Sequence, residues 1–310
     1  MISKFKNIIR DQVKKNTLIK EISNLKAKIL YLLLNDEQYT KYKFKSLHGE
    51  VLNLNNPRTF NEKLAVIKLN NRDSLTTKCS DKYTVREYVK EKLSDNILVP
   101  LFGVYERAEE IDFDVLPDSF VLKANHGSGY TIVCRDKLKM DKKETIKKLN
   151  KWISQNYFIY SREWQYKNIS PKIVCEELLS GSEGQIPEDY RFFCFDGEPK
   201  FIAVDLESVD EKGNKKSHYF RNIYDTDWNM LDFRIGHENN REIVLEKPKE
   251  LEKMLEYARI LSEDFKHARI DFFYINNKIY FGEITFCHSG GMQKVYPEEY
   301  SIRLGDLIKI

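Results

Sequence analysis

Residues 268–292 read ARIDFFYINNKIYFGEITFCHSGGM, and this stretch decides the fold more than any other. Two β-rich runs flank an Asn-Asn pair, which predicts a hairpin whose turn is Asn276-Asn277. Asp271 and Glu283 stand 12 residues apart on the two predicted arms. Because the arms of a hairpin lie side by side, we expect the two carboxylates to meet on one face.

These two carboxylates are candidate ligands for Mg²⁺, which is usually held by few protein oxygens and completed by substrate phosphates. Both acids are embedded in apolar runs, so we expect at least one of them near the interior, where a carboxylate needs a compensating cation. Arg269 and Arg191 would supply positive charge if the strands converge. The alternative is that both acids are ordinary surface residues of a two-sided hairpin.

A second candidate is FVLKANHGSG at residues 120–129, where an apolar strand delivers Lys123 to the loop Gly127-Ser128-Gly129. Glycines let a backbone approach a ligand closely, and amides together with a lysine hold negative oxygens, so the segment suits a polyphosphate. It is not a Walker A loop, and most short loops of this kind are simple turns between strands.

A further polar loop, His288-Ser289-Gly290-Gly291, directly follows the predicted hairpin. Its hydroxyl and amides are candidates to hold a substrate carboxylate. The alternative for His288 is a solvated loop residue.

The composition is that of a folded protein, with 41% hydrophobic and 32% charged residues in a chain of 310. From about residue 97, short β-rich runs alternate with helices, which indicates an α/β or α+β domain. The longest apolar run, Ile29 to Leu34, is too short to cross a bilayer, and no export signal follows the basic start. The five cysteines include no CxxC pair. We therefore expect a soluble protein in a reducing cytoplasm.

Positive charge is concentrated at the start of the chain. The first fifty residues carry 11 Lys and Arg against 5 Asp and Glu, and the remainder carries 40 against 43. The near-neutral body offers no broad basic face for a nucleic acid. Residues 2–34 place apolar residues at helical spacings with lysines between them, so this stripe either packs on the body or lies on an anionic membrane at the inner face.

The order of these pieces resembles the ATP-grasp superfamily of carboxylate–amine ligases. The matching pieces are the strand with its lysine and glycine loop, the EELL that follows a strand, RIDF, and GEITF followed by SGG. The resemblance narrows to the TupA-like branch, found with teichuronopeptide and capsular polysaccharide synthesis, and covers roughly residues 45–305. The segments that carry it are NPRTFNEKLAVIKLNNRD, SDKYTVREYV, FVLKANHGSG and YFRNIYDTDWN.

The resemblance implies an α+β, ATP-grasp fold in which two lobes clasp ATP after an α-helical N-terminal section. It divides the chain into a basic amphipathic segment (1–45), a helical section (46–96), a lobe with the Gly-rich lid (97–178) and a lobe with the metal site (179–310).

The resemblance also implies a role for each candidate residue. Lys123 would bind the phosphates of ATP, and Arg191 and Arg269 would be catalytic, at the phosphate end and at the acyl-phosphate. Many members have Asn two residues after the metal-binding Glu; here Thr285 stands there, and its hydroxyl can still ligate Mg²⁺. The other expected sites are a lid (Gly127, Ser128, Gly129), a hinge around adenine and ribose (Glu176, Glu177, Leu178, Leu179), metal ligands (Asp271, Glu283) and a substrate loop (His288, Ser289, Gly290, Gly291).

The expected activity is ADP-forming ligation of an amino acid or amine to a carboxylate, with a uronic acid of a surface glycan as the carboxylate. One alternative is a glycosyltransferase that uses Asp225-Thr226-Asp227 as a metal-binding triplet, although DTDWN is more typical of a turn before Trp228. Another is a non-catalytic scaffold that is held at a membrane by its basic N-terminal helix.

Overall fold

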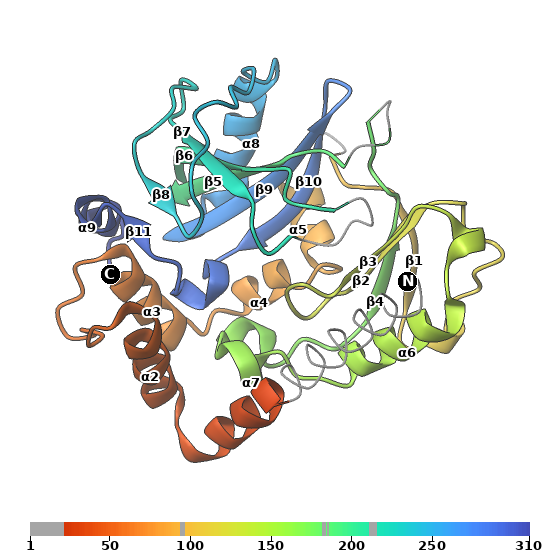
Figure 1. Ribbon diagram of the computed structural model, residues 1–310, viewed down its shortest axis with the longest axis horizontal. Helices are drawn as coiled ribbons and strands as arrows, with labels where there is room; N and C mark the ends of the chain where they lie inside the picture. Colours follow the sequence, from red (N-terminus) through yellow and green to blue (C-terminus); the bar gives the residue numbers. More distant parts are fainter. Residues whose placement is uncertain (1–21, 94–96, 182–183, 185, 211–215) are drawn as a thin grey trace, which may run out of the picture.

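Two antiparallel sheets organise the structure, a computed structural model that describes residues 22–93, 97–181, 184, 186–210 and 216–310. The first sheet has the strand order β1-β4-β2-β3, and the second has the order β10-β9-β5-β6-β7. The five-stranded sheet lies above the four-stranded one in Figure 1, and helices cover both. A short third sheet pairs β8 with β11.

The elements have the following bounds. The strands are β1 (Leu101–Tyr105), β2 (Phe120–Ala124), β3 (Thr131–Cys134), β4 (Ile173–Glu176), β5 (Asp189–Phe195), β6 (Glu198–Leu206), β7 (Phe220–Tyr224), β8 (Arg234–Ile235), β9 (His267–Ile275), β10 (Lys278–Thr285) and β11 (Val295–Tyr296). The α-helices are α2 (Asp36–His48), α3 (Phe60–Asn70), α4 (Ser74–Ser80), α5 (Val85–Lys92), α6 (Lys142–Ile153), α7 (Phe158–Ser161), α8 (Leu251–Ser262) and α9 (Glu298–Asp306). The 3₁₀ turns are η1 (Ala108–Glu110), η2 (Lys137–Lys139), η3 (Trp164–Tyr166) and η4 (His288–Gly291).

The predicted hairpin is confirmed. β9 and β10 pair antiparallel and are joined by Asn276 and Asn277, whose φ angles are 51° and 59°. Asparagine tolerates this left-handed conformation better than most residues, which is why an Asn-Asn pair closes a two-residue turn.

Helix α3 begins with a hydrogen-bonded cap at Thr59. The Thr59 hydroxyl accepts a hydrogen bond from the Glu62 amide, and the Glu62 carboxylate accepts one from the Thr59 amide. This reciprocal cap satisfies two amides that have no partner inside the helix. Since the cap fixes where α3 begins, it also fixes which side of the helix faces the five-stranded sheet.

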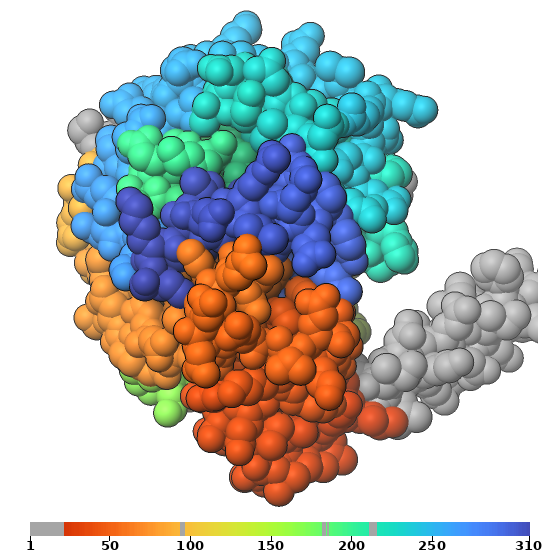
Figure 2. Space-filling model, turned by 90° about the vertical axis from the view of Figure 1, so that its left-hand side faces the viewer, coloured from red at the N-terminus to blue at the C-terminus, as the bar shows by residue number. Residues whose placement is uncertain are grey.

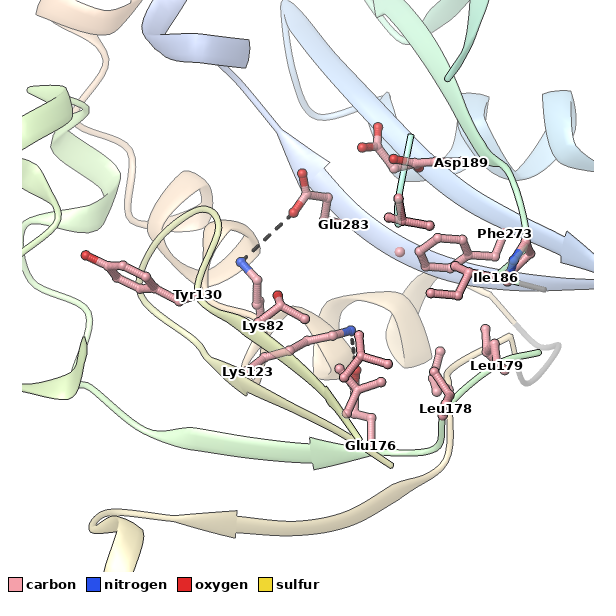
Figure 3. Close-up of a pocket in the computed structure, with 18 of the residues that line it drawn as sticks. Lys82, Lys123, Tyr130, Glu176, Leu178, Leu179, Ile186, Asp189, Phe273 and Glu283 are labelled. Carbon is pink, nitrogen blue, oxygen red and sulfur yellow. Dashed lines mark hydrogen bonds and ion pairs between the residues drawn. The ribbon is translucent and has the colours of Figure 1, made fainter. Parts of the chain in front are cut away.

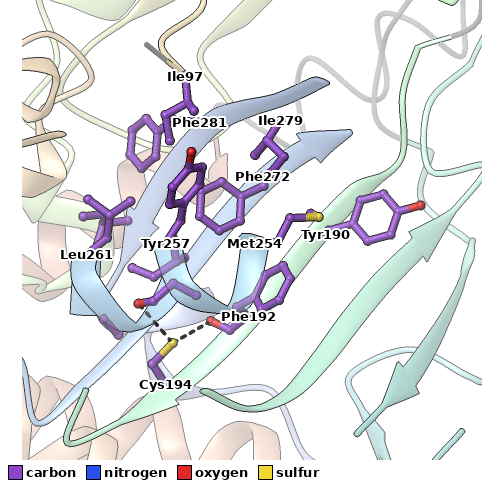
Figure 4. Close-up of a cluster of buried hydrophobic side chains, with 14 of the residues drawn as sticks. Ile97, Tyr190, Phe192, Cys194, Met254, Tyr257, Leu261, Phe272, Ile279 and Phe281 are labelled. Atoms are coloured by element: carbon purple, nitrogen blue, oxygen red, sulfur yellow. Dashed lines mark hydrogen bonds between the residues drawn. The ribbon is translucent and has the colours of Figure 1, made fainter. Parts of the chain in front are cut away.

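Alternation along β5 gives the five-stranded sheet two different faces. Phe192 and Cys194 point to α8, where they pack with Met254 and Leu261 (Figure 4). Phe193 and its neighbours on the opposite face pack against α3 and α9. Because successive side chains of a strand alternate in direction, the residues of β5 that share the face of Phe193 include Asp189 and Arg191. That face is therefore apolar at one end and charged at the other.

The C-terminal segment meets helix α3 on this face. The Lys63 ammonium in α3 donates to the Ile308 carbonyl just beyond α9 at 2.8 Å. Figure 2 shows the dark blue C-terminal segment lying directly on the orange N-terminal section. The helices α3 and α9 thus close one side of the sheet together.

A buried arginine fastens the N-terminal helices to the four-stranded lobe. The Arg162 guanidinium donates to Asp36 at 2.8 Å and to the carbonyls of Leu30 and Leu34. It also lies over the rings of Tyr31 and Tyr39, at 4.5 and 4.8 Å from their centroids. Arg162 therefore holds the N-terminal helices by both an ion pair and cation–π contacts.

Residues 22–33 are helical, and residues 1–21 of the predicted amphipathic segment lie outside the described residues. None of the described helices combines the length and the apolar character needed to cross a bilayer.

Two histidines are buried beside aromatic rings on the α3 side of the sheet. The imidazole of His267 lies 5.4 Å from the Phe60 ring, and that of His288 lies 5.5 Å from the same ring. Burial lowers the pKa of His267 to about 4 and lowers the pKa of His288 well below its ordinary value. Both imidazoles are therefore neutral in the folded protein at neutral pH.

Acid should destabilise the protein through these histidines. Between pH 6.5 and about 4 the unfolded chain binds protons that the folded chain does not, so the free energy of unfolding falls as the pH falls. From pH 7.5 to pH 5.5 we expect a loss of about 1 kcal/mol for each imidazole. Urea unfolding of His267→Gln should show a flatter pH dependence, whereas His218→Gln, at an exposed histidine, should match the parent. An unchanged pH dependence in His267→Gln would contradict this account.

Candidate active site

A cavity of about 770 Å³ lies between the two sheets. Its apolar wall includes Leu178, Leu179, Ile186 and Phe273, which gather on one side in Figure 3, whereas Lys82 and Glu283 lie on the other. Ligand sites of this size commonly combine apolar walls with a few fixed polar groups. The cavity therefore suits a ligand with one flat apolar end and one charged end.

The four-stranded sheet contributes a buried ion pair to the cavity. Lys123 and Glu176 project from the same face of the neighbouring strands β2 and β4, where their charged atoms lie 2.6 Å apart. Arg86 in α5 pairs with the second Glu176 oxygen at 3.1 Å. Glu176 thus orients two cations. Its expected contact with adenine stays a prediction, as do the roles of Glu177, Leu178 and Leu179, which line the cavity.

The glycine loop between β2 and β3 is fixed at its base and exposed at its tip. Asn125 is fully buried; its side-chain amide donates to Asp81 at 2.8 Å and its carbonyl oxygen accepts from the Lys172 amide at 2.7 Å. Ser128 and Gly129 are exposed and line the cavity. Gly129 has a φ of 74°, a conformation that favours glycine. A loop built this way can shift at its tip without losing its base, as a lid requires.

Lys82 had no predicted role, although it lies where the two lobes meet. Its ammonium donates to the Gly127 carbonyl at 2.8 Å and lies 4.0 Å from the Glu283 carboxylate (Figure 3). Burial lowers the pKa of Lys82, and Glu283 opposes that effect. Lys82 lies in the turn between α4 and α5, within the SDKYTVREYV segment. Only the resemblance of that segment to a known family pointed to it.

The two predicted metal ligands do share one face, and a bulge makes them do so. Asp271 is the cross-strand partner of Glu283, and the register shifts between Phe281 and Glu283. A regular ladder from the Asn-Asn turn would pair Asp271 with Gly282 and would direct Glu283 to the other face. The extra residue in β10 therefore creates the carboxylate pair.

Gly282 is the residue that permits this bulge. A β-carbon at this position would lie 2.9 Å from the Asp271 carbonyl oxygen, closer than side chains approach backbone atoms. We expect Gly282→Ala to push the two carboxylates apart and to cost about 1–3 kcal/mol of folding free energy. Chemical denaturation together with Mg²⁺-dependent nucleotide binding would measure both effects.

The matched control for Gly282→Ala is Gly103→Ala, beside the bulge of β1. There the nearest atoms to an added methyl group all belong to the movable Tyr105 side chain. Equal behaviour of the two variants would show that the close approach at Gly282 is unimportant.

Arg269 donates hydrogen bonds to both carboxylates. Its guanidinium donates to both oxygens of Asp271, at 2.7 and 2.6 Å, and to Glu283 at 3.2 Å. The Thr285 hydroxyl donates to Glu283 at 2.9 Å. Burial raises the pKa of Asp271, and the Arg269 guanidinium works against that rise. Burial also opposes ionisation of Glu283, but Lys82 and Arg269 outweigh it and lower the pKa of Glu283 to about 2.

Arg191 connects Asp271 of β9 to the aspartates of β5 and β6. It pairs with Asp189 at 2.5 Å and with Asp205 at 2.7 Å, and it lies 3.7 Å from Asp271. The aspartates at 189 and 205 had no predicted role. Asp189 is the cross-strand partner of Asp205, so β5 and β6 present both acids on the face that bears Arg191. The sequence offered only the alternation of DYRFF as a signal.

The side chains around Glu283 suit an open Mg²⁺ site better than a metal site that is closed by protein ligands alone. Among the described residues, no group of three or more His, Cys, Asp or Glu side chains is placed to hold a metal. Asp271 and Glu283 instead offer two carboxylates beside a cavity with room for phosphates, and 43% of the Glu283 side chain stays exposed. Mg²⁺ commonly takes one or two carboxylates and keeps its other positions for water and substrate oxygens.

The predicted substrate loop is bonded to α3. No residue of 288–291 is among the described residues that line it. Lys68 donates to the Gly290 carbonyl at 3.2 Å and Asn61 to the Gly291 carbonyl at 2.8 Å, so α3 holds the loop. Ser289 has a φ of 51°, a strained value for a residue with a side chain. His288 is buried rather than solvated, and the role of the loop in substrate binding stays a prediction.

The aspartate triplet at 225–227 forms the turn that its composition favours. The Asp225 carboxylate accepts from the amides of Asp227 at 3.0 Å and Asn229 at 2.7 Å, just before and after Trp228. Neither aspartate is among the described residues that line the cavity. A metal-binding role for the triplet has no support from this arrangement.

Two α+β lobes enclose the cavity, with Lys123 on one and Asp271 and Glu283 on the other, as in the class of ATP-grasp proteins. The chain belongs to the TupA-like ATP-grasp family, because the family model described as TupA-like ATPgrasp matches residues 62–309. The predicted family and fold are both confirmed.

The chain is also similar to solved ligases. An L-amino acid ligase from Bacillus licheniformis is 13% identical, with 82% of this chain and 55% of that chain covered and a TM-score of 0.47. D-alanine–D-alanine ligases match from Helicobacter pylori (19% identity, 75% and 61% covered, TM-score 0.41) and Bacillus anthracis (17%, 67% and 57%, 0.41). The chain thus spans between 55% and 61% of the length of these three ligases. No curated protein matches it.

Proposed function

We propose that the protein is an ATP-dependent ligase that joins an amino acid or amine to a carboxylate, with release of ADP. The observation that carries this proposal is the meeting of Lys82 and Lys123 with Asp271 and Glu283 around one cavity. These residues come from segments that are distant along the chain. Cations and metal-binding carboxylates on opposite walls are what a triphosphate with its magnesium requires.

The proposal gives the charged residues particular tasks. Lys82, Lys123 and Arg191 would hold the phosphates, and Asp271 and Glu283, with Thr285 beside them, would hold Mg²⁺. Magnesium, when bound, neutralises charge that develops on the transferred phosphoryl group. Arg269 is already bonded to both carboxylates, so it lies next to the place where that charge would develop. Positioning and electrostatic stabilisation account for most catalysis of phosphoryl transfer.

The apolar end of the cavity would take the base of the nucleotide. Leu178, Leu179 and Phe273 supply flat apolar surface, and the exposed Glu177 stands at the rim for the ribose. The Gly127-Ser128-Gly129 loop would close over the phosphates. Closure matters because a carboxylate activated as an acyl-phosphate is lost if water reaches it before the amine does.

The carboxylate substrate that we propose is a uronic acid of a cell-surface or capsular polysaccharide. Support for it comes from the resemblance to the teichuronopeptide branch and not from any sugar-specific residue. The His288-Ser289-Gly290-Gly291 loop is the proposed contact for the substrate, since it follows the metal-binding strand directly.

The test is an ADP-release assay of the purified protein with Mg-ATP, a panel of uronic-acid sugars and a panel of amino acids. Release of ADP and phosphate only when both substrates are present supports amide ligation. Release of UDP from a nucleotide sugar without ATP would favour the glycosyltransferase instead. Absence of ATP binding by the parent protein would refute the proposal at its first step.

A further inference from the structure

The helix at residues 22–33 presents an apolar stripe to solvent. Among the described residues, sixteen large hydrophobic side chains are exposed, and six of them fall within these twelve positions. Leu32 and Leu33 are 82% and 71% exposed. Exposed apolar residues are usually scattered singly, so such a concentration indicates a contact surface.

The exposed residues share one side of the helix. Ile22, Leu25, Ile29, Leu32 and Leu33 recur at the three- and four-residue spacings of a single helical face. The opposite side is partly covered, with Ala27, Leu30 and Leu34 less accessible. We name the five exposed residues the apolar stripe.

The helix is held with the apolar stripe outward. Arg162 bonds the carbonyls of Leu30 and Leu34, and Tyr31 packs edge-on against Phe158 at 6.3 Å. In Figure 1 the red to orange helix runs along the lower edge of the molecule, away from the five-stranded sheet. Because these contacts already hold the helix, binding a partner does not require the entropic cost of ordering it.

The charges beside the apolar stripe select the kind of partner. Lys26 and Lys28 are exposed and project on its two flanks, and residues 22–33 contain no acidic residue. A second copy placed on the same face would bring these lysines together without a carboxylate to pair with them. An anionic lipid surface satisfies both features, because its headgroups attract lysines while its interface accepts Leu and Ile side chains.

We propose that the apolar stripe docks this protein on the surface of an anionic bilayer, with the helix lying in the headgroup plane. The interaction goes beyond the proposed ligase activity, since residues 22–33 lie outside the family match at 62–309. Membrane contact would hold the enzyme beside lipid-linked or membrane-proximal substrates without a spanning helix.

Flotation of the full-length protein with vesicles tests the proposal. Vesicles of phosphatidylcholine mixed with phosphatidylglycerol should retain the protein, and vesicles of phosphatidylcholine alone should not. Leu32→Ser with Leu33→Ser should weaken binding at least about tenfold. Lys26→Gln with Lys28→Gln should weaken it by about fivefold for each lysine removed, and added salt should have a similar effect.

The matched control is Val115→Ser with Leu138→Ser, which removes two side chains that are 76% and 90% exposed elsewhere. This variant should bind vesicles as the parent does, and all variants should keep the parent's ATP affinity. Equal binding of parent and Leu32/Leu33 variant would overturn the proposal, and so would equal binding to both kinds of vesicle. A dimeric parent that becomes monomeric in the Leu32/Leu33 variant would overturn it too, since the apolar stripe would then join two copies.

Discussion

Glu283→Gln should leave the protein folded and remove the magnesium-dependent ATP turnover that we propose. Glutamine keeps the volume and the hydrogen bond from Thr285 but removes the charge that Lys82 and Arg269 surround. Loss of one of the two proposed metal ligands should lower kcat/KM by about 10³ or more. The measurement is ADP release against Mg²⁺ concentration, with a thermal melt to verify folding.

Glu198→Gln is the matched control for that experiment. Glu198 also lies in the five-stranded sheet, but it pairs at the surface with Arg259, and each side chain is 50% exposed. Its replacement should change neither turnover nor the Mg²⁺ requirement. If Glu283→Gln keeps the parent's Mg²⁺ dependence, the metal lies elsewhere and the carboxylate pair has only a structural role.

Arg191→Met should be among the most destabilising single changes in the chain. Arg191 is 6% exposed and pairs with Asp189 and Asp205, with Asp271 close by. Removing one partner of a buried ion pair leaves charge without compensation and typically costs about 3–5 kcal/mol. Urea denaturation at pH 7 would measure the loss.

The same variant should also change its pH dependence in a defined direction. Burial raises the pKa of Asp271, and Arg191 is one of the cations that oppose this rise, so without Arg191 the folded state binds more protons. Stability of the variant relative to the parent should then improve as the pH falls from 7 towards 5. The exposed Arg303, which pairs with Glu299 at 3.8 Å, provides the control Arg303→Met, with an expected effect within about 0.5 kcal/mol. A similar loss in both variants would argue against a special role for Arg191.

Local features of the chain were predictable from sequence because their causes are local. The Asn276-Asn277 turn, the cap at Thr59 and the strand with Lys123 each depend on residues within a few positions. The β-rich run DYRFFCF likewise coincides with β5. Such elements need no knowledge of the rest of the fold.

The bulge at Gly282 could not be predicted from local alternation alone. The turn alone pairs Asp271 with Gly282, so the predicted meeting of the two carboxylates needed an irregularity that alternation does not provide. The glycine inside YFGEITF is the one local signal, since a glycine within a strand often marks a bulge.

Lys82, Arg86 and Arg162 were beyond sequence reasoning for a different reason. Each is an ordinary basic residue whose partners lie 45 or more positions away, in Gly127, Glu176 and Asp36 respectively. Such charges have no local pattern, because only tertiary packing decides that they are buried and paired. In a site assembled from several segments, the motifs can therefore be predicted from sequence, and the charged residues that connect them cannot.

The junction of α3 with the end of the chain has a consequence for synthesis on the ribosome. Lys63 and its partner carbonyl at Ile308 are 245 positions apart, and the same helix packs Phe60 and Leu64 against residues that are translated late. At about 5–20 residues per second, the nascent chain carries this uncovered helix for roughly 12–50 s. Until α9 has been made, the side of α3 that α9 covers is available to chaperones or to neighbouring nascent chains, and a message truncated before α9 would leave that side uncovered.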